Sequence, residues 1–498
     1  MEVHPDILQG EAIGNIVSDH PPDLRRVLIR LKTGVRVKPF EYIVAPMKEN
    51  GETVFIVLRV LNLQDINPYA TSRIVDIEDR LGTIDGSEGV DLPRRYVLAV
   101  AEPVDAFRIE HGGDIHHFGP TILPKAGLNV YRAGESTLMA LVGRVNHPVR
   151  IGSLVGAENV TVSIDANNLA RHMIIVGTTG SGKSWFRGVL LEELHRIGIP
   201  QVNFDPLGDF VKATEELGGT NIKPGEDYKP RLDALSEGDF ARLIEGRIPT
   251  PFQQAIAVSA FLRFKETSKK SLAPLEPERL LDCLSEAARD YNASHDTEVN
   301  TRMRLSALMR DLGILGTGLK VEESWTRLLK TKKIVNVDVR YLTDLQLQMV
   351  VASILRELIS LRRKNAIPPL IVSFEEAHRI VPRRGDSLSG EVVRQLVRFG
   401  RHMGIGIIAI TQFPDSIDEE LIRLPASRVI FASDPTQLRE IRGLLKDLPD
   451  EVLTVLPRLE TGTAVLTGTA DVIRHSLYIK VSSRRRTTHG GETPSLVE

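Results

Sequence analysis

The residues with the clearest chemical potential form one glycine-rich segment. Residues 177–184 read GTTGSGKS and match the pattern G-x-x-x-x-G-K-[ST]. Glycines let the backbone curl so that successive N–H groups point at phosphate oxygens, and a following helix adds its positive end. In such a loop Lys183 reaches the β- and γ-phosphates of a nucleotide, and the Ser184 hydroxyl binds Mg²⁺. The pattern predicts an ATP and Mg²⁺ site made by Gly177, Thr178, Thr179, Gly180, Ser181, Gly182, Lys183 and Ser184.

Two adjacent carboxylates form a second candidate group. Residues 368–378 read PPLIVSFEEAH, an apolar run that ends in Glu375 and Glu376. Neighbouring side chains at the end of a strand point in different directions. We therefore expect Glu375 to bind Mg²⁺ and Glu376 to act as the general base that activates water. The alternative is a solvated Glu-Glu pair at a helix start, where acids favour the helix dipole.

Three further polar residues adjoin the expected strands. The apolar run 405–410 is followed by Thr411 and Gln412, and the Gln412 amide is suited to sensing a γ-phosphate or orienting water. The alternative for Gln412 is an ordinary polar strand end. Arg401 ends a helix beside that strand, where it can reach a neighbouring subunit's γ-phosphate as an arginine finger. Arg171, directly before the phosphate-loop strand, is a second arginine expected near nucleotide.

The segment 379–402 is basic, with six arginines against two carboxylates. We expect the loops 379–389 and 413–419 to contact DNA phosphates, with Arg383 and Arg384 in the basic one. A solvated helix face is an equally good interpretation for the arginines farther along, Arg394 and Arg398.

The elements that must position these residues change in character along the chain. Residues 1–165 contain short β-rich runs between Pro-, Gly- and Asn-containing turns, which predicts a small N-terminal β-barrel. The expected strands in this region are 27–31, 53–60, 96–100 and 137–142.

From residue 166 to 481 the pattern alternates between strands and helices. A strand at 172–176, a helix at 184–197 and a strand at 201–204 form the beginning of a parallel sheet with covering helices. Residues from about 213 to 330 are expected to be a helical insertion into this α/β domain. The strands and helices that follow are expected at 334–339, 344–363, 370–374, 391–402, 405–410 and 428–431. Residues 482–498 are expected to be a tail or an arm.

The composition is that of an ordinary globular protein. The 498 residues include 63 Lys and Arg against 65 Asp and Glu, and 42% of the chain is hydrophobic. The longest apolar runs are far shorter than the roughly 20 residues that span a bilayer, and the first residues show no secretory pattern. One cysteine, Cys283, is typical of a reducing compartment. We therefore expect a cytoplasmic protein with no membrane association.

The order of the motifs resembles HerA, the hexameric DNA-translocating ATPase of the FtsK/HerA branch of P-loop NTPases. The resemblance is carried by 177–184, 205–210, 374–378, 399–404 and 410–412. It implies a RecA-like core, a HAS-barrel-like N-terminal region, and a homohexameric ring with double-stranded DNA in its pore. It also implies a NurA-type nuclease that docks on the barrel side for DNA end resection in double-strand break repair. The family roles fall on Lys183, Ser184, Glu376, Gln412, Arg401 and Arg171.

The chain departs from the family at one motif and leaves one functional alternative open. The usual Asp-Pro-His-Gly-Glu-Tyr is changed at Leu207, Asp209 and Phe210, so the roles of Asp205 and Asp209 are open. The alternative function is an ATP-dependent ring scaffold or clamp that activates a partner effector, for example in antiviral defence, without translocation.

Overall fold

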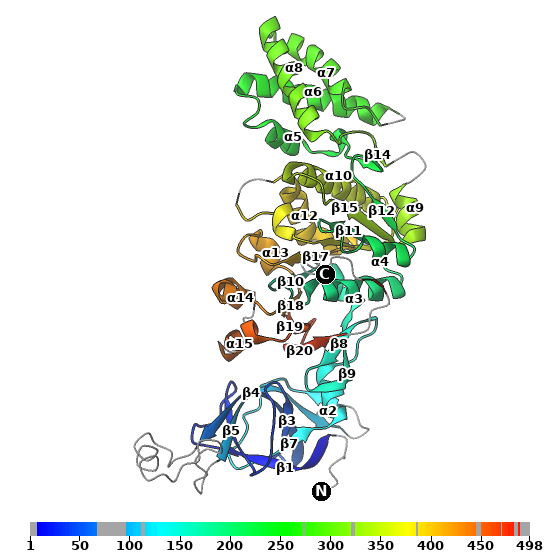
Figure 1. Cartoon of the computed structure of the whole chain (residues 1–498). Helices are drawn as coiled ribbons and strands as arrows, with labels where there is room; N and C mark the ends of the chain where they lie inside the picture. Colours follow the sequence, from blue (N-terminus) through cyan, green and yellow to red (C-terminus); the bar gives the residue numbers. More distant parts are fainter. Residues whose placement is uncertain are drawn as a thin grey trace, which may run out of the picture.

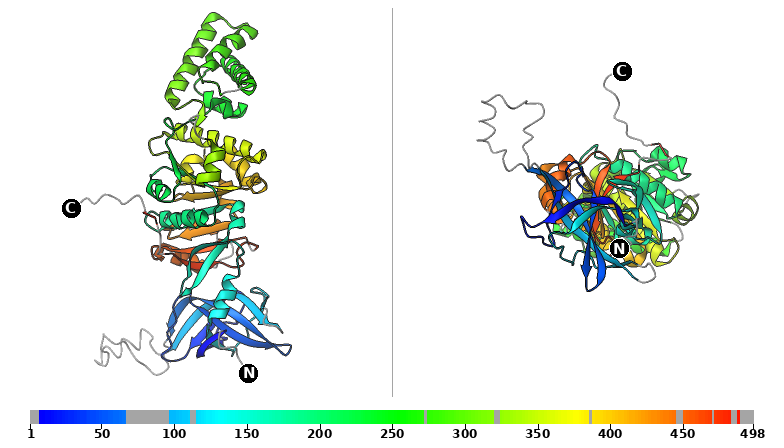
Figure 2. Two further views of the ribbon diagram at one scale, coloured as in Figure 1. Left: turned by 90° about the vertical axis from the view of Figure 1, so that its right-hand side faces the viewer. Right: turned by 90° about the horizontal axis from the view of Figure 1, so that it is seen from below.

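The chain folds into three parts stacked along one long axis. The computed structural model describes residues 7–66, 96–110, 115–271, 274–319, 324–384, 387–444, 450–469, 471–482 and 487–488. A β-domain lies at one end, an α/β layer in the middle and a helical subdomain at the other end (Figures 1 and 2).

The N-terminal part is one antiparallel sheet whose ends meet. Its strand order is β2-β1-β7-β3-β4-β5-β6, and an additional pairing of β2 with β5 closes the sheet into a barrel. Alternate side chains such as Ile29, Ile43 and Ile56 fill its interior, because neighbouring residues of a strand point to opposite faces. The small β-barrel predicted from the sequence is confirmed. Its strands are β1 (Leu8–Val17), β2 (Val27–Leu31), β3 (Tyr42–Glu49), β4 (Glu52–Ile66), β5 (Tyr96–Ile109), β6 (Ile115–His117) and β7 (Asn129–Ala133).

One predicted strand of this region is wrong. Residues 137–142 belong to helix α2 (Glu135–Val142). Thr137 and Leu141 are its buried residues, and their spacing of four places them on one helical face.

The central part is an 11-stranded sheet with the order β12-β15-β11-β16-β17-β10-β18-β19-β20-β8-β9. The run from β12 to β18 is parallel, as the alternating pattern predicted, and the last four strands are antiparallel. The parallel strands are β10 (Met173–Val176), β11 (Gln201–Asp205), β12 (Thr220–Ile222), β15 (Ile334–Asp338), β16 (Leu370–Phe374), β17 (Ile405–Thr411) and β18 (Ser427–Phe431). The others are β8 (Pro148–Leu154), β9 (Ala157–Asp165), β19 (Thr463–Gly468) and β20 (Leu477–Val481).

Helices cover both faces of this sheet and create two separate cores. Helix α3 (Lys183–Arg196) packs on one face with Met173 and Ile175 of β10. Helices α10 (Asp344–Arg363) and α12 (Leu388–Met403) pack on the other face with Ile174 and Val176. Strands buried on both faces consist largely of apolar residues, which is why β10 and β17 appear in the sequence as hydrophobic runs.

The expected boundary at residue 165 is corrected by the strand pairing. Leu154 of β8 pairs with Ile479 of β20, so the β8–β9 hairpin is the edge of the central sheet and not part of the barrel. In the same way β12 lies inside the expected insertion at 213–330 but pairs with β15 of the central sheet.

The helical subdomain occupies the middle of the expected insertion. Thr250 caps helix α6 and Pro251 begins it, since the Thr250 hydroxyl accepts a hydrogen bond from the Gln253 N–H at 3.3 Å. The helices are α5 (Glu237–Ile244), α6 (Pro251–Lys270), α7 (Arg279–Asp290) and α8 (His295–Leu312). They lie at the end of the molecule opposite the barrel (Figure 1).

Short elements complete the described chain. They are α4 (Val211–Glu216), β13 (Tyr228–Lys229), β14 (Gly318–Leu319), α9 (Trp325–Arg327), α11 (Ala377–Ile380), α13 (Glu419–Arg423), α14 (Leu438–Leu444) and α15 (Asp450–Val455). Most of the expected tail at 482–498 lies outside the described residues. Within them, the Thr487 and Thr488 N–H groups donate to Glu192 at 3.0 Å and Glu216 at 2.7 Å. In the described ranges, no helix has the length and apolar character needed to cross a bilayer.

Candidate nucleotide site

The parallel strands bring the predicted site residues together at the carboxyl-terminal edge of the sheet, where the strands end. Strands β10, β17 and β16 are neighbours, with Val176 opposite Thr411 and Phe374 opposite Ala409. Their carboxyl ends therefore lie together, and the segments that follow them meet at this edge. Ligand sites of open α/β sheets form at this edge.

The phosphate loop needs its glycines for conformation and for space. Gly180 and Gly182 have φ angles of +76° and +112°, which residues with a Cβ adopt only with strain. A Cβ on Gly182 would lie 3.0 Å from the Cα of Gly462, and one on Gly177 would lie 2.6 Å from the Cβ of Phe431. The Gly462 N–H also donates to the Ser181 carbonyl at 2.9 Å. The loop is thus fixed by the segments before β19 and at the end of β18.

Lys183 is held in the loop by a contact that a phosphate can replace. Its Nζ donates to the Thr178 carbonyl oxygen at 2.7 Å. Burial lowers the pKa of Lys183, and the negative charges of Glu376 and Glu375 oppose that effect. An anion at the loop would restore the stabilisation that burial removes from the ammonium group.

Glu376 and Gln412 join the phosphate loop through a chain of polar contacts. The Thr179 hydroxyl donates to Gln412 Oε1 at 2.6 Å, and Gln412 Nε2 donates to Glu376 Oε2 at 3.5 Å. Glu376 also has a left-handed backbone with φ of +48° and ψ of +49°. A residue other than glycine in this region is strained, and such strain concentrates at functional sites.

Glu375 lies behind Glu376 in the interior. Its side chain is buried, and its Oε1 has no hydrogen-bond partner. Burial raises the pKa of Glu375 to about 8, with the nearby Asp205, Asp209 and Glu376 adding to the shift and Arg187 opposing it. A cation at Oε1 would give this oxygen a partner and would stabilise the charged form of the carboxylate. Carboxylate and hydroxyl oxygens suit Mg²⁺. The chemistry of Glu375 therefore fits the predicted metal site, and the part of Ser184 in that site stays a prediction.

Arg187 is a residue of the site that the sequence reasoning missed. It lies one turn after Lys183 on α3 and is 1% exposed. Its guanidinium donates to the Asn203 side chain and lies 5.6 Å from the centre of the Phe210 ring. The signal in the sequence is an arginine on the apolar face of a helix, between Phe186 and Leu190.

The structure assigns Asp205 a role in holding the 205–210 turn. Its carboxylate accepts hydrogen bonds from the N–H groups of Gly208 at 2.7 Å and Phe210 at 3.0 Å. Burial raises the pKa of Asp205, whereas these hydrogen bonds lower it. Asp209 is buried in this turn and within electrostatic reach of Glu375.

The two predicted arginines lie at the amino-terminal ends of the parallel strands. The phosphate loop lies at the opposite, carboxyl-terminal ends. Arg171 ends helix η1 (Ala166–Arg171) before β10 begins and forms an ion pair with Asp471. Arg401 is exposed in the last turn of α12, before β17 begins. A Cβ on Gly400 would lie 3.2 Å from the His172 ring, so the two arginine segments are close neighbours. Neither arginine is placed to serve the phosphate loop of its own chain.

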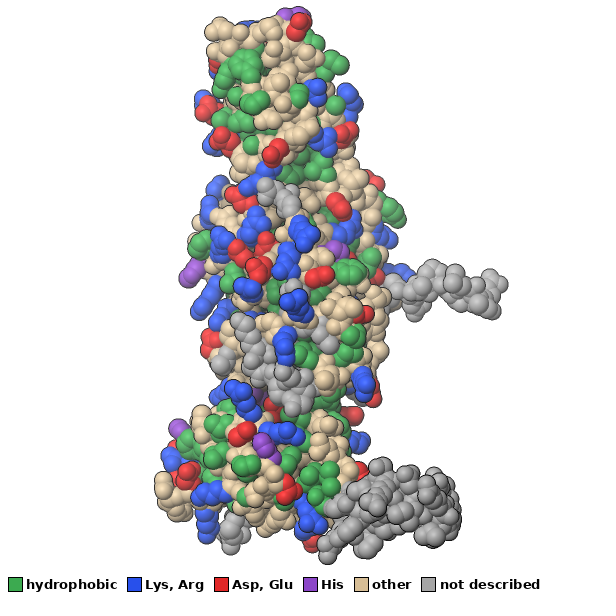
Figure 3. All heavy atoms as spheres, turned by 90° about the vertical axis from the view of Figure 1, so that its left-hand side faces the viewer, with side chains coloured by type: hydrophobic (Ala, Val, Ile, Leu, Met, Phe, Trp, Pro, Cys, Tyr) green, Lys and Arg blue, Asp and Glu red, His purple; other side chains and the backbone are tan. Residues whose placement is uncertain are grey.

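Ion pairs occupy part of the basic segment 379–402. Arg394 donates to Asp418 at 3.1 Å, and Arg398 forms an ion pair with Glu420. These contacts favour the alternative in which this face is a solvated helix surface. Lys and Arg side chains nevertheless gather over the middle part of the molecule on one face (Figure 3).

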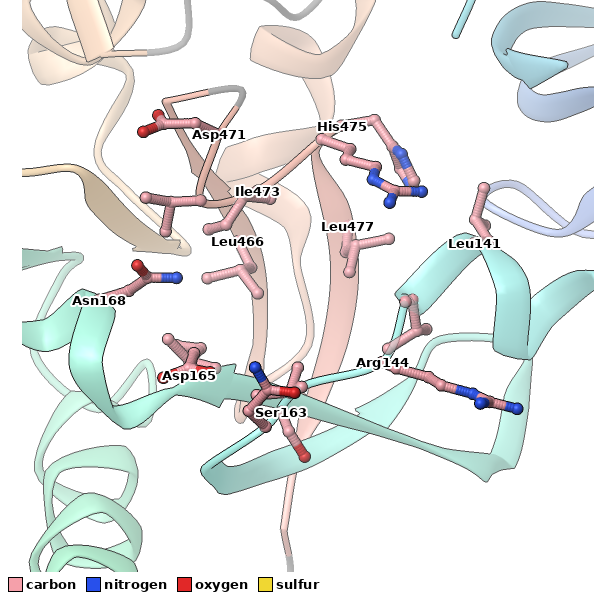
Figure 4. Close-up of a pocket in the computed structure, with 17 residues that line it drawn as sticks. Leu141, Arg144, Ser163, Asp165, Asn168, Leu466, Asp471, Ile473, His475 and Leu477 are labelled. Atoms are coloured by element: carbon pink, nitrogen blue, oxygen red, sulfur yellow. The ribbon is translucent and has the colours of Figure 1, made fainter. Parts of the chain in front are cut away.

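A hollow of about 350 Å³ lies elsewhere, between α2, β9 and the segment 471–477. Figure 4 shows Leu141, Arg144, Ser163, Asp165, Asn168, His475 and Leu477 around it. Its lining includes Asp471, the partner of Arg171, and no residue of the phosphate loop.

A parallel sheet with a phosphate loop after one strand (β10) and a glutamate after the next strand but one (β16) defines a P-loop ATPase. Comparison with known proteins shows which P-loop ATPases this chain resembles. Residues 149–358 match the family model described as "Helicase HerA, central domain". Over this central part the chain is similar to the HerA family of P-loop ATPases. The match begins at β8, in agreement with the pairing of that strand in the central sheet, and ends before Glu375.

Three similar proteins extend this comparison. A DNA double-strand break repair helicase HerA of Sulfolobus acidocaldarius is 28% identical over 401 residues, covering 76% of this chain and 77% of the relative. A probable helicase of Methanocaldococcus jannaschii is 22% identical over 515 residues, covering 93% and 94%. The structure of VirB4 of Thermoanaerobacter pseudethanolicus is 14% identical with a TM-score of 0.53, covering 68% of this chain and 97% of VirB4, and shows the fold alone.

Proposed function

We propose that this chain is an ATP-driven motor that moves along duplex DNA as a homohexameric ring and works with a nuclease in DNA end resection. The observation that carries this proposal is the meeting of Lys183, Glu376 and Gln412 at one edge of the sheet. Arg401 lies exposed at the other edge. This arrangement fits a site completed by a second subunit.

The residues at the carboxyl edge divide the chemistry of hydrolysis between them. Lys183 leaves the Thr178 carbonyl and places its charge on the β- and γ-phosphates of ATP. Glu376 accepts the proton of the water that attacks the γ-phosphorus, and the Gln412 amide orients that water. Mg²⁺, held by Ser184 and Glu375, would neutralise charge on the phosphates. Thr179 places Gln412 through its 2.6 Å hydrogen bond.

The arginine edge would supply the remaining positive charge from the next subunit. Arg401 stabilises charge on the γ-phosphate in the transition state, and Arg171 approaches the same nucleotide from its place beside α12. A heterologous contact of this kind repeats around a rotation axis and closes into a ring. The pore of such a ring is where duplex DNA would run, contacted by the loops 379–389 and 413–419.

The DNA substrate and the partner are proposed from the relatives. Several are named DNA double-strand break repair helicases. We place a NurA-type nuclease on the barrel side of the ring and the complex in the cytoplasm, where a chain with one cysteine stays reduced.

Native mass measured together with the ATPase rate tests this proposal. Samples with and without ATP, Mg²⁺ and duplex DNA are compared. A six-fold assembly whose hydrolysis rises with DNA supports the motor, whereas a fully active monomer contradicts the ring. Displacement of a triplex-forming strand then separates a motor from a clamp, because a clamp hydrolyses ATP without displacing the strand.

A further inference from the structure

The imidazole of His378 lies between the proposed catalytic base and the loop that follows β17. Its Nδ1 is 3.3 Å from Glu376 Oε2 and 3.4 Å from the Thr411 hydroxyl. The ring meets that of Phe413 edge to face, with 5.2 Å between the centroids. The side chains of His378 and Glu376 are each 20% exposed. The ring is therefore oriented from two sides before any substrate binds.

The contacts determine which nitrogen of the ring can act on Glu376. A carboxylate next to a neutral imidazole favours the tautomer that carries the proton on the facing nitrogen, here Nδ1. Burial lowers the pKa of His378, which favours the neutral ring. Glu376, Asp344 and Asp415 oppose this shift and Arg379 adds to it. Arg379 in turn donates to Asp344 at 2.8 Å, so Glu376 Oε2 and the Thr411 hydroxyl are the oxygens that lie next to Nδ1.

We propose that His378 is a positioning residue whose Nδ1–H holds the Glu376 carboxylate in place for water activation. Gln412 approaches the same Oε2 at 3.5 Å from the phosphate-loop side. Nδ1 of His378 and Nε2 of Gln412 thus both lie next to one carboxylate oxygen, which leaves the other oxygen of Glu376 to accept a proton. Glu376 is the left-handed N-cap residue of α11, and its side chain makes no capping hydrogen bond to that helix, so its position depends on contacts of this kind. This inference rests on the proposed ATPase function.

Two substitutions of His378 separate positioning from a purely structural role. His378→Leu removes the donor and keeps apolar bulk against Phe413. His378→Asn places an amide N–H where Nδ1 stood. The matched control is His295→Leu, an exposed histidine in the helical subdomain. For each variant we would measure kcat and KM for ATP, the affinity for a fluorescent ATP analogue, and thermal unfolding.

The expected result is a split between turnover and binding. His378→Leu lowers kcat by about 10- to 100-fold, the scale of a misplaced catalytic group, with KM and analogue affinity changed less than threefold. His378→Asn recovers most of the loss, and His295→Leu matches the wild type. Unchanged kcat in His378→Leu, or equal losses of kcat and analogue binding in both His378 variants, overturns the inference alone. A wild-type chain that hydrolyses no ATP overturns the proposed function itself.

Discussion

At the scale of single residues, the site depends on one glutamate in an unfavourable conformation. Glu376 follows β16 with a left-handed backbone, and its carboxylate is contacted by Gln412 from one side and approached by His378 from the other. Glu375, one residue earlier, is buried and has a raised pKa. The two neighbours therefore occupy different environments, which is the condition for dividing acid–base and metal-binding roles between two carboxylates.

Replacing Glu376 with glutamine should abolish turnover and preserve binding. Glutamine keeps the size and the polar contacts of the side chain but cannot accept the proton of the attacking water. We expect kcat to fall by about 10²- to 10⁴-fold, the contribution of a general base, with the affinity for ATP nearly unchanged. Lys183→Ala is the contrasting variant and should weaken ATP binding itself. Steady-state ATPase rates and analogue titrations check both, and an active Glu376→Gln would exclude Glu376 as the base.

His172 gives the molecule a predictable dependence on acid. Its Nδ1 accepts the Ile407 N–H at 3.0 Å, and burial lowers the pKa of His172 to about 4. Below pH 6.5 His172 becomes protonated in the unfolded chain, whereas in the folded chain it stays neutral down to about pH 4. Between these two pH values, this residue therefore makes the free energy of unfolding fall as the pH falls.

His172→Asn should remove this contribution, because an amide oxygen can accept the Ile407 N–H but does not titrate. We expect the unfolding free energy of the wild type to decline relative to the variant by up to about 1.4 kcal/mol for each pH unit. Denaturant unfolding between pH 6.5 and 4 measures the difference. Parallel curves for the two proteins would contradict the prediction.

At the scale of elements, the sequence was most informative where signals are local. The helix predicted at 344–363 and the strand at 370–374 have the bounds of α10 and β16. The Thr250-Pro251 cap gave the start of α6. These features depend on hydrophobic periodicity and on helix capping, and both signals lie within a short stretch of sequence.

Features that depend on distant pairing could not be predicted in this way. The β8–β9 hairpin joins β20, more than 300 residues later in the chain, and nothing in its own residues specifies that partner. The burial of Arg187 beside Asn203 and the hydrogen bonds of Asp205 to its own turn also require the packed structure. In the site, the phosphate loop, Glu376 and Gln412 were found because each follows a strand of one parallel sheet.

Two glycines with positive φ angles separate the cost of backbone conformation from the cost of steric crowding in the phosphate loop. Gly182 combines a φ of +112° with a Cβ position 3.0 Å from Gly462, whereas Gly218 has a φ of +72° and open space around it. Gly218→Ala should cost about 1–2 kcal/mol from conformation alone and leave ATP binding intact. Gly182→Ala should cost more and should also weaken ATP binding, because the loop must shift to admit the methyl group. Thermal unfolding and analogue affinity measure both, and equal effects in the two variants would exclude crowding.

At the scale of the whole molecule, the barrel is joined to the central sheet by a buried polar contact and by ring stacking. Arg59 of β4 is 2% exposed and pairs with Glu102 of β5, and it also donates to the Ser476 carbonyl ahead of β20. The Phe40 ring stacks on Tyr478 of β20 with 3.8 Å between the centroids.

The same strand continues to the nucleotide site. The Val481 N–H at the end of β20 donates to the Gly462 carbonyl at 2.8 Å, and Gly462 in turn donates to Ser181 of the phosphate loop. One strand thus connects the barrel, where a partner would dock, with the loop that would bind phosphates.

In the proposed ring, each complete ATP site needs residues from two subunits. Lys183 and Arg401 lie at opposite edges of the sheet, so a complete site needs Lys183 of one subunit and Arg401 of the next. Lys183→Ala and Arg401→Ala should each be inactive alone, the second with ATP binding intact. Mixed rings regain activity, because an Arg401→Ala subunit can present its intact phosphate loop to the intact Arg401 of a Lys183→Ala neighbour. With random equal mixing about a quarter of the interfaces are complete.

The ATPase rate of the mixture, measured after subunit exchange and compared with the sum of the two separate rates, checks this prediction. Arg398→Ala is the matched control, since Arg398 lies one turn earlier on α12 and pairs with Glu420. It should be active without mixing. A fully active Arg401→Ala, or exchanged rings that gain nothing, would place the finger elsewhere. Because both arginines of the amino edge face away from their own phosphate loop, the same experiment with Arg171→Ala would then decide between them.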